Sequence, residues 1–182
     1  MFPLQRLGAE VWAINTVQFS NHTGYGHWTG DVFSGAQVRA LVDGVAARGV
    51  LGTCDAVLSG YVGDAAIGEA ILDAVARVRS ENPRALYCCD PVIGDDRDGV
   101  YVRPGIAEML RDRMLPAADI ATPNRFELDM LTGTACHTLD QAKASVAQGS
   151  PVSRSSSKRL GVAMSACGRA CSRRMVSMPG RT

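Results

Sequence analysis

Short apolar runs alternate with amphipathic segments along most of this chain, and that alternation limits the folds open to it. The apolar runs are of strand length and are partly β-branched, as in CDAVLSGY and ALYCCDPV. The amphipathic segments repeat apolar residues at helical spacing, and Ser34 is a candidate cap for one of them. This order predicts an α/β fold, with a parallel sheet flanked by helices and right-handed crossovers.

The expected elements follow from the same pattern. The expected strands are Val11–Val17, Cys54–Tyr61, Ala85–Val92 and Asp119–Thr122. The expected helices are the helix end in FPLQRLGAE, then Gly35–Arg48, Ala65–Arg79, Pro104–Met114, Asn124–Leu131 and a last helix from Thr138 to Gln148.

Polar, glycine-rich loops follow each expected strand. They are Asn15–Gly30, Ser59–Asp64, Asp90–Asp95 and Thr122–Glu127. In open parallel sheets, ligands bind beyond the carboxyl ends of the strands. The chain is therefore expected to bind a small molecule at this edge of the sheet.

Four segments together resemble the pyridoxal kinases of the ribokinase-like superfamily. They read NTVQFSNHTGYGHWTG, CDAVLSGYVGD, CDPVIGD and TPNRFELDMLTG, and the resemblance covers about residues 2–149. It implies an incomplete ribokinase-like fold. The implied activity is ATP-dependent phosphorylation of the 5′-hydroxymethyl group of pyridoxal, with Mg²⁺, in vitamin B6 salvage by a homodimer. A related hydroxymethylpyrimidine kinase and a non-catalytic ligand-binding remnant are the alternatives.

The nucleotide side of the expected site comes from the last two of these segments. By itself, Asp90 is a turn residue at a strand end, and Asn124 with Glu127 forms a capping box at a helix start. The resemblance adds further roles to these residues. It implies that Asp90, Thr122 and Glu127 bind ATP, and that Asp90, Asn124 and Glu127 hold the metal.

The substrate side is expected in the first two segments. The resemblance implies that Thr23 and Gly24 contact the pyridine ring, and some relatives carry Gln at the position of Gly24. Tyr61 is an aromatic residue that could stack on the ring or fill the core. His22 is expected to pack within its loop.

No residue of the chain is assigned as the catalytic base. The family uses a G-x-G-D turn whose N–H groups stabilise the transferring phosphoryl group and whose Asp deprotonates the hydroxyl. The runs Gly60–Asp64 and Thr29–Asp31 look similar but lie in the wrong segments, and no such turn follows Gly149. We therefore expect this copy to be impaired as a kinase.

Charge divides the chain in two. Residues 1–140 carry all 18 acidic side chains and 11 basic ones, whereas residues 141–182 carry 8 basic and no acidic ones. We therefore expect a partial kinase domain over residues 1–149 and a basic Ser/Arg-rich tail over 150–182. The tail sequence has no strand run and is expected to be disordered or non-native. A reading-frame shift near Gly149 would explain the change, and Met1 is expected to be an internal start.

Composition excludes several other classes of protein. No apolar run reaches the roughly 20 residues of a membrane span, and no secretory signal is evident, so a cytoplasmic protein is expected. The six cysteines lack zinc spacing and are expected to be reduced. A nucleic-acid role for the basic tail is disfavoured, because the tail has no aromatic residue and the body is acidic.

Overall fold

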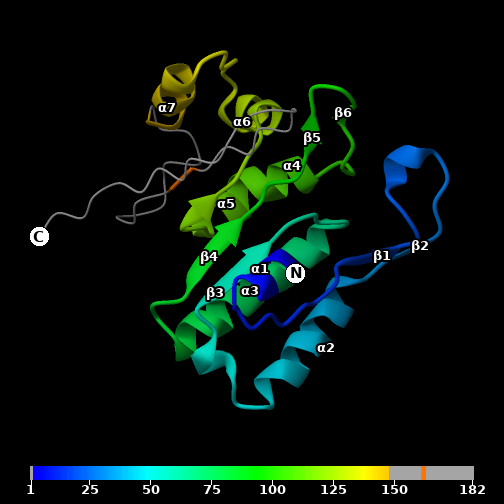
Figure 1. The fold of residues 1–182 in the computed structure, drawn as a ribbon, viewed down its shortest axis with the longest axis vertical. Helices are drawn as coiled ribbons and strands as arrows, with labels where there is room; N and C mark the ends of the chain where they lie inside the picture. Colours follow the sequence, from blue (N-terminus) through cyan, green and yellow to red (C-terminus); the bar gives the residue numbers. More distant parts are fainter. Residues whose placement is uncertain (1, 148–160, 163–182) are drawn as a thin grey trace, which may run out of the picture.

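A four-stranded parallel sheet with helices on one side organises the computed structural model, which describes residues 2–147 and 161–162 (Figure 1). The sheet strands are β3 (Ala56–Ser59), β4 (Leu86–Cys89), β7 (Ile120–Ala121) and β8 (Gly161–Val162), in that spatial order. Every pairing within this sheet is parallel. The expected α/β fold with a parallel, helix-flanked sheet is therefore confirmed.

The remaining strands form two small antiparallel hairpins. One pairs β1 (Val17–Phe19) with β2 (Gly30–Val32), and the other pairs β5 (Gly94–Asp95) with β6 (Gly99–Val100). The β1–β2 hairpin projects from the body, whereas the β5–β6 hairpin stands beside α6 (Figure 1).

The helices differ in length and in how they begin. They are α1 (Phe2–Arg6), α2 (Gly35–Ala46), α3 (Ala65–Glu81), α4 (Ile106–Met109), the π-helical turn η3 (Leu110–Met114), α5 (Leu115–Ala117), α6 (Arg125–Thr132) and α7 (Leu139–Ala147). Short 3₁₀ turns lie at η1 (Thr23–Tyr25) and η2 (Leu51–Thr53). The Ser34 hydroxyl accepts a hydrogen bond from the Gln37 N–H, and the Asp64 carboxylate accepts one from the Ala66 N–H, so α2 and α3 begin where local side chains satisfy their free N–H groups. Among the described residues, no helix is long and apolar enough to cross a membrane.

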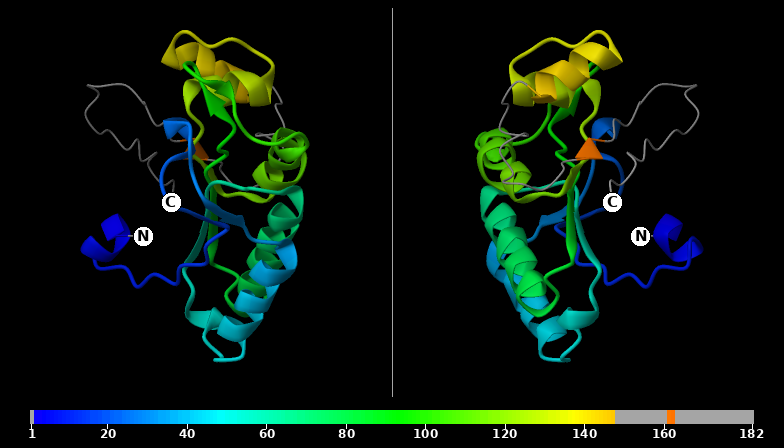
Figure 2. Two further views of the ribbon diagram at one scale, coloured as in Figure 1. Left: turned by 90° about the vertical axis from the view of Figure 1, so that its right-hand side faces the viewer. Right: turned by 90° about the vertical axis from the view of Figure 1, so that its left-hand side faces the viewer.

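The hydrophobic core lies between the sheet and helices α2 to α5. Side chains from β4, α3 and the α4–α5 region meet there, including Tyr87, Ile67, Leu110 and Met114, each almost fully buried. Figure 2 shows these helices on one side of the sheet, while α1 is the described helix that stands on the other. The face of β3 and β4 turned away from the core leaves Leu58 60% and Leu86 46% exposed.

Two expected elements differ from the structure. The expected strand Val11–Val17 is irregular as far as Thr16, and only Val17 pairs, with Val32 of β2. The apolar sequence is suited to a strand, but no strand among the described residues lies where it could pair with residues 11–16. The helix expected from Pro104 begins instead at Ile106, because Gly105 adopts a left-handed conformation with φ of 87°.

The segment after residue 149 contains one described element, β8, which pairs with β7. β7 offers an edge that this short apolar stretch satisfies. The division of the chain into a kinase domain and a basic tail stays a prediction. The rest of the expected tail lies outside the described residues, and so does Gln148, the expected end of the last helix.

Candidate functional site

Asp90 begins the loop that follows β4 at the carboxyl end of the sheet. Its N–H donates to the Ser59 carbonyl (2.9 Å), which continues the ladder between β3 and β4 for one more bond. The Thr122 hydroxyl donates to Oδ1 of Asp90 (2.8 Å), so the ends of β4 and β7 are joined through two side chains. The other carboxylate oxygen, Oδ2, has no hydrogen-bond partner among residues 2–147 and 161–162.

Asn124 and Glu127 form the capping box that the sequence indicates. The Glu127 N–H donates to Oδ1 of Asn124 (2.9 Å), and the Asn124 N–H donates to Oε2 of Glu127 (2.8 Å). The pair also holds the loop after β4. The Ile93 N–H donates to Oε1 of Glu127 (3.0 Å), and Nδ2 of Asn124 donates to the Gly94 carbonyl (2.8 Å).

Glu127 is buried, with 3% of its surface exposed. Burial raises the pKa of its carboxyl above the usual range, and the neighbouring Asp90 carboxylate adds to the increase. Hydrogen bonds from the backbone N–H groups of Asn124 and Ile93 act in the opposite direction. Both oxygens of Glu127 are thus used to fix backbone, whereas Asp90 keeps one oxygen open.

The β5–β6 hairpin forms one wall of this site. The Asp95 carboxylate accepts hydrogen bonds from the N–H groups of Arg97 (2.9 Å) and Asp98 (2.8 Å), which closes the turn. Arg125 of α6 forms ion pairs with Asp96 of the hairpin and with Asp129 of its own helix. The acidic run at residues 95–98 is therefore a structured turn beside α6.

Tyr101 lies beside the candidate site, although no pattern in the sequence points to it. It follows β6, and its N–H donates to the Ile93 carbonyl (3.1 Å). Partial burial and the negative charges of Glu127, Asp95 and Asp90 raise the pKa of its phenol. The hydroxyl therefore lies within electrostatic reach of the site. Because Tyr101 belongs to no motif, only the folding of the hairpin reveals this.

The expected substrate residues Thr23 and Gly24 lie in η1, within the projecting hairpin loop. Both are exposed, and the Gly24 N–H donates to Nδ1 of His22 (3.1 Å), so His22 serves as a packing and capping residue. At the base of the loop, the Phe19 and Trp28 rings pack against each other with their centroids 4.4 Å apart. Within the described part of the chain, no hydrogen bond or ion pair joins this loop to Asp90, Thr122, Asn124 or Glu127.

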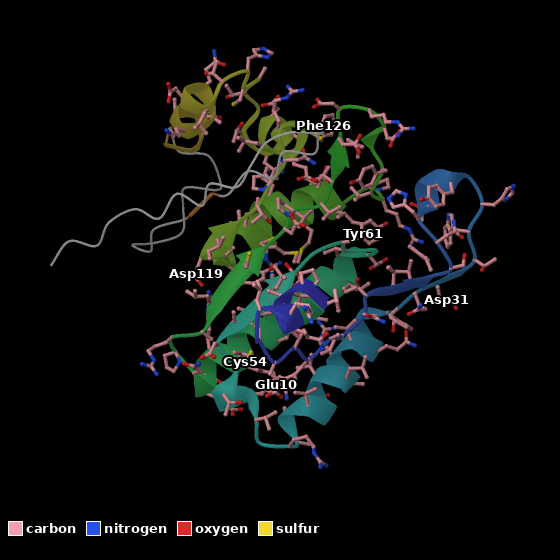
Figure 3. All side chains as sticks on the ribbon, in the orientation of Figure 1. Glu10, Asp31, Cys54, Tyr61, Asp119 and Phe126 are labelled. Atoms are coloured by element: carbon pink, nitrogen blue, oxygen red, sulfur yellow. The ribbon has the colours of Figure 1, made fainter. Side chains whose placement is uncertain are left out.

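Tyr61 lies closer to the centre of the molecule, just after β3 (Figure 3). Its carbonyl accepts a hydrogen bond from the Thr16 hydroxyl (2.8 Å), which ties it to the start of the loop at residues 15–30. Its side chain is half-buried and lines the upper end of a cavity beside β3. Tyr61 is thus tied to the segment that leads into the exposed loop.

The acidic residues of the two runs that look like a catalytic turn have roles in secondary structure. Asp64 is the N-cap of α3, and Asp31 lies in β2 opposite Gln18.

Asp90 is the residue of the site best suited to a divalent cation. Within the described part of the chain, no group of three or more His, Cys, Asp or Glu side chains is arranged to hold a metal ion. Mg²⁺ rarely needs such a cage, since it is usually bound by one or two carboxylates, water and the phosphates of its substrate. The open Oδ2 of Asp90 fits that pattern, and Asn124 and Glu127 hold the adjacent loop in place.

Comparison with known proteins identifies the family of the chain. The model of the phosphomethylpyrimidine kinase family matches residues 13–150. The chain belongs to this family. It is 67% identical over 146 residues to the pyridoxal kinase PdxY of Granulibacter bethesdensis, a match that covers 80% of this chain and 51% of the relative. It is 59% identical over 144 residues to the PdxY of Rubrobacter xylanophilus, covering 79% of this chain and 50% of the relative.

Solved structures of pyridoxal kinases are also similar to this chain. Pyridoxal kinase from Leishmania donovani in complex with ADP and pyridoxamine superimposes with a TM-score of 0.75 at 34% identity, over 80% of this chain and 52% of that one. The resemblance to pyridoxal kinases expected from the sequence is confirmed. The chain spans about half the length of the curated relatives it matches.

Proposed function

We propose that this chain carries the nucleotide and substrate residues of a pyridoxal kinase, which transfers a phosphoryl group from ATP to the 5′-hydroxymethyl group of pyridoxal. The observation that carries the proposal is the cluster of Asp90, Thr122, Asn124 and Glu127, which two strand ends and one helix start form at the carboxyl edge of the sheet. Homologous kinases that bind ADP and B6 vitamers support it.

In this proposal Asp90 holds Mg²⁺ through its open carboxylate oxygen, and Asn124 and Glu127 serve the metal site by holding the loop after β4 in place. When bound, the ion neutralises charge on the phosphates. Thr122 orients the Asp90 carboxylate through the hydrogen bond at its Oδ1. The start of α6 adds partial positive charge at the same place, which favours the phosphates of ATP.

Thr23, Gly24 and Tyr61 are proposed to bind the pyridine substrate. Because the Gly24 N–H is already bonded to His22, its carbonyl is the backbone group available to a ligand. Tyr61 can offer its ring face for stacking, since it is half-buried at the mouth of a cavity. The hairpin loop must come toward Tyr61 if all three residues are to touch one ligand.

Phosphoryl transfer is the step for which the 182 residues supply no evident base. The sequence contains no G-x-G-D turn, and Asp64 is already engaged as a helix cap. We propose that the chain as given binds its ligands but transfers the phosphoryl group poorly. The alternative, a ligand-binding protein without transfer, differs from this only in having no turnover at all.

Two measurements on the unmodified chain test the proposal. Isothermal titration calorimetry with ADP, with and without Mg²⁺, and separately with pyridoxal, is expected to give saturable binding of both ligands. A coupled assay for ADP release is expected to give a rate at least ~100-fold below that of the G. bethesdensis relative, since loss of a positioned base costs roughly 10²–10⁴-fold. If neither ligand binds, the proposal is wrong.

Hydroxymethylpyrimidine is a second candidate substrate, because the matching family model describes phosphomethylpyrimidine kinases. Titration of the chain with hydroxymethylpyrimidine and with pyridoxal under the same conditions distinguishes the two. The proposal expects pyridoxal to bind more tightly.

A homodimer is the proposed assembly, as the family resemblance implies. The projecting hairpin leaves Tyr25 80% and Trp28 42% exposed, and aromatic residues are enriched in protein interfaces. Sedimentation equilibrium that fits a single 19.3 kDa species at all concentrations would contradict it.

A further inference from the structure

The loop that follows β3 is held at both of its ends. The strand ends at Ser59, whose carbonyl accepts a hydrogen bond from the Asp90 N–H (2.9 Å). At the other end of the loop, Asp64 caps α3 through its carboxylate. Residues 60–63 lie between these two ends, and Tyr61 is one of them. The position of Tyr61 therefore depends on what holds the middle of a short loop.

Thr16 holds the middle of this loop through its side chain. The Thr16 hydroxyl donates to the Tyr61 carbonyl (2.8 Å), although the two residues are 45 positions apart in the sequence. Within the described part of the chain, no other hydrogen bond reaches that carbonyl. A partly buried carbonyl that loses its donor costs free energy. The Thr16 hydroxyl therefore stabilises the present position of the Tyr61 backbone.

The backbone of Thr16 belongs to the base of the β1–β2 hairpin. Its carbonyl accepts a hydrogen bond from the Phe33 N–H (3.0 Å), one step beyond the paired residues Val17 and Val32. Thr16 thus joins two segments that are distant in the sequence. Its backbone closes the hairpin, and its side chain holds the loop that carries Tyr61.

A close contact at Gly63 holds the same two segments together. A Cβ added at Gly63 would lie 2.6 Å from Cγ1 of Val32 and 3.1 Å from Cγ1 of Val17. Val32 is β-branched and packs against the main core, so its side chain has little freedom to move aside. The hairpin base and the loop after β3 are therefore in contact at two places, Thr16 and Gly63.

The Tyr61 side chain is near the nucleotide side of the site. Burial and three nearby carboxylates raise the pKa of the Tyr101 phenol, and Tyr61 adds a smaller increase. The Tyr61 phenol is therefore within electrostatic reach of Tyr101. Because an error of about 1 Å in the placement of a bound group can cost much of its effect, the backbone that carries this ring has to be held firmly.

We propose that Thr16 is a positioning residue for substrate recognition, because its hydroxyl fixes the Tyr61 backbone and thereby the ring that stacks on the pyridine substrate. This inference rests on the proposed role of Tyr61 in binding pyridoxal. Thr16 acts through Tyr61 and does not itself touch the substrate. A β-branched residue with a hydroxyl suits this role, since its restricted χ1 keeps the donor aimed at the carbonyl.

Three variants of the full chain isolate the hydroxyl. Thr16→Val keeps the β-branched shape and the backbone bond to Phe33, but it removes the donor. Thr16→Ser keeps the donor. Thr53→Val is the matched control, because the Thr53 hydroxyl also donates to a backbone carbonyl, that of Val50 (2.8 Å), in an exposed turn.

Calorimetry with pyridoxal, and separately with ADP and Mg²⁺, compares these variants with the parent chain. Thr16→Val should weaken pyridoxal binding about tenfold, the effect of losing one hydrogen bond. It should leave ADP binding unchanged, because the bonds that hold Asp90 and Glu127 do not involve Thr16. Thr16→Ser and Thr53→Val should bind both ligands like the parent chain. General damage to the fold would instead weaken both ligands.

Gly63→Ala tests the second contact and gives a result even if Thr16→Val fails to fold. The added Cβ should push the loop away from Val32, so pyridoxal binding should again weaken while ADP binding is kept. Gly60→Ala is the matched control in the same loop, because its added Cβ meets no atom within 4 Å.

Hydrogen exchange on the unliganded chain tests the positioning without a substrate. The amides of residues 61–63 should exchange faster in Thr16→Val than in Thr16→Ser, while the amides of α6 keep their rates. If the parent chain binds no pyridoxal, the proposed function is wrong, and the exchange rates decide whether Thr16 positions the loop. The inference is overturned if Thr16→Val binds pyridoxal as tightly as Thr16→Ser, if it weakens ADP binding equally, or if the two variants exchange alike at residues 61–63.

Discussion

Two neighbouring carboxylates of the site have different environments. Glu127 is buried and both its oxygens accept backbone N–H groups, whereas Asp90 binds the Thr122 hydroxyl through one oxygen and keeps the other open. A carboxylate saturated by backbone holds a loop in place, and one with an open oxygen can bind a cation. The two residues are therefore expected to respond differently to substitution.

Asp90→Asn should weaken Mg²⁺-dependent ADP binding by about tenfold or more, because the amide loses the negative charge that attracts the ion. Thermal stability should change little, since the amide oxygen still accepts the Thr122 hydroxyl. Calorimetry with ADP in Mg²⁺ and in EDTA measures the effect. Asp73→Asn, on the exposed side of α3, is the matched control. Equal ADP affinities of the two variants in Mg²⁺ would show that Asp90 does not hold the metal ion.

Glu127→Gln tests the buried carboxyl through pH. Because the pKa of Glu127 is raised in the folded chain, the folded state binds more protons than the unfolded state between the usual value of 4.5 and the raised value. Its contribution to stability is therefore fully present below 4.5 and is lost as pH rises through the folded pKa. The free energy of unfolding, measured with urea between pH 4 and 7, should fall less steeply with pH in the variant than in the parent chain. An unchanged slope would contradict the raised pKa.

At the scale of elements, the β5–β6 hairpin is positioned by α6. Asn124 holds the Gly94 carbonyl, Glu127 holds the Ile93 N–H, and Arg125 pairs with Asp96. Gly94 is required at the base of the hairpin because an added Cβ would lie 2.2 Å from the Gly99 carbonyl oxygen and 2.7 Å from the Phe126 ring. Figure 3 shows Phe126 beside this hairpin.

Gly94→Ala should separate the two strands of the hairpin and weaken ADP binding. The clashing atom is the backbone carbonyl oxygen of Gly99, which cannot move aside as the end of a flexible side chain can. Gly99→Ala is the matched control in the same hairpin. Its Cβ meets no atom within 4 Å, but its φ of 68° makes any side chain cost about 1 kcal/mol. We expect the Gly94 variant to lose more ADP affinity than the Gly99 variant, as measured by calorimetry. The reverse order would show that the hairpin accommodates a Cβ at residue 94 without changing the ADP site.

At the scale of the whole molecule, one ion pair joins three elements at the end of the sheet opposite the site. Asp119, before β7, accepts hydrogen bonds from Arg79 of α3 and from the Tyr87 N–H of β4. Arg79 also donates to the Ala117 carbonyl (3.1 Å). The pair is largely buried, so loss of one partner leaves a charge with poor hydration.

Asp119→Ala should lower the free energy of unfolding by about 3 kcal/mol, because Arg79 loses its counter-charge and the Tyr87 N–H loses its acceptor. Asp73→Ala, which breaks the exposed pair with Arg39, should cost less than about 1 kcal/mol. Urea denaturation followed by circular dichroism compares the two variants. Equal losses would mean that burial does not strengthen the Arg79–Asp119 pair.

Much of the fold follows from local sequence signals. The alternation of segments predicts the parallel sheet, and Ser34 and Asn124 mark helix starts that the structure confirms. The motif residues Asp90, Thr122, Asn124 and Glu127 could be predicted to meet because parallel strands end at one edge. Tyr101 could not, since it reaches the site only through the hairpin.

The sequence by itself therefore determined the alternation of strands and helices, the helix caps and the family, because each depends on residues a few positions apart or on contiguous motifs. Tertiary structure alone decided which oxygen of which carboxylate stays open, and that the apolar segment Val11–Thr16 forms no ladder among the described residues. Those outcomes depend on the partners that distant segments bring, and a strand-forming sequence pairs only where another strand is available to it.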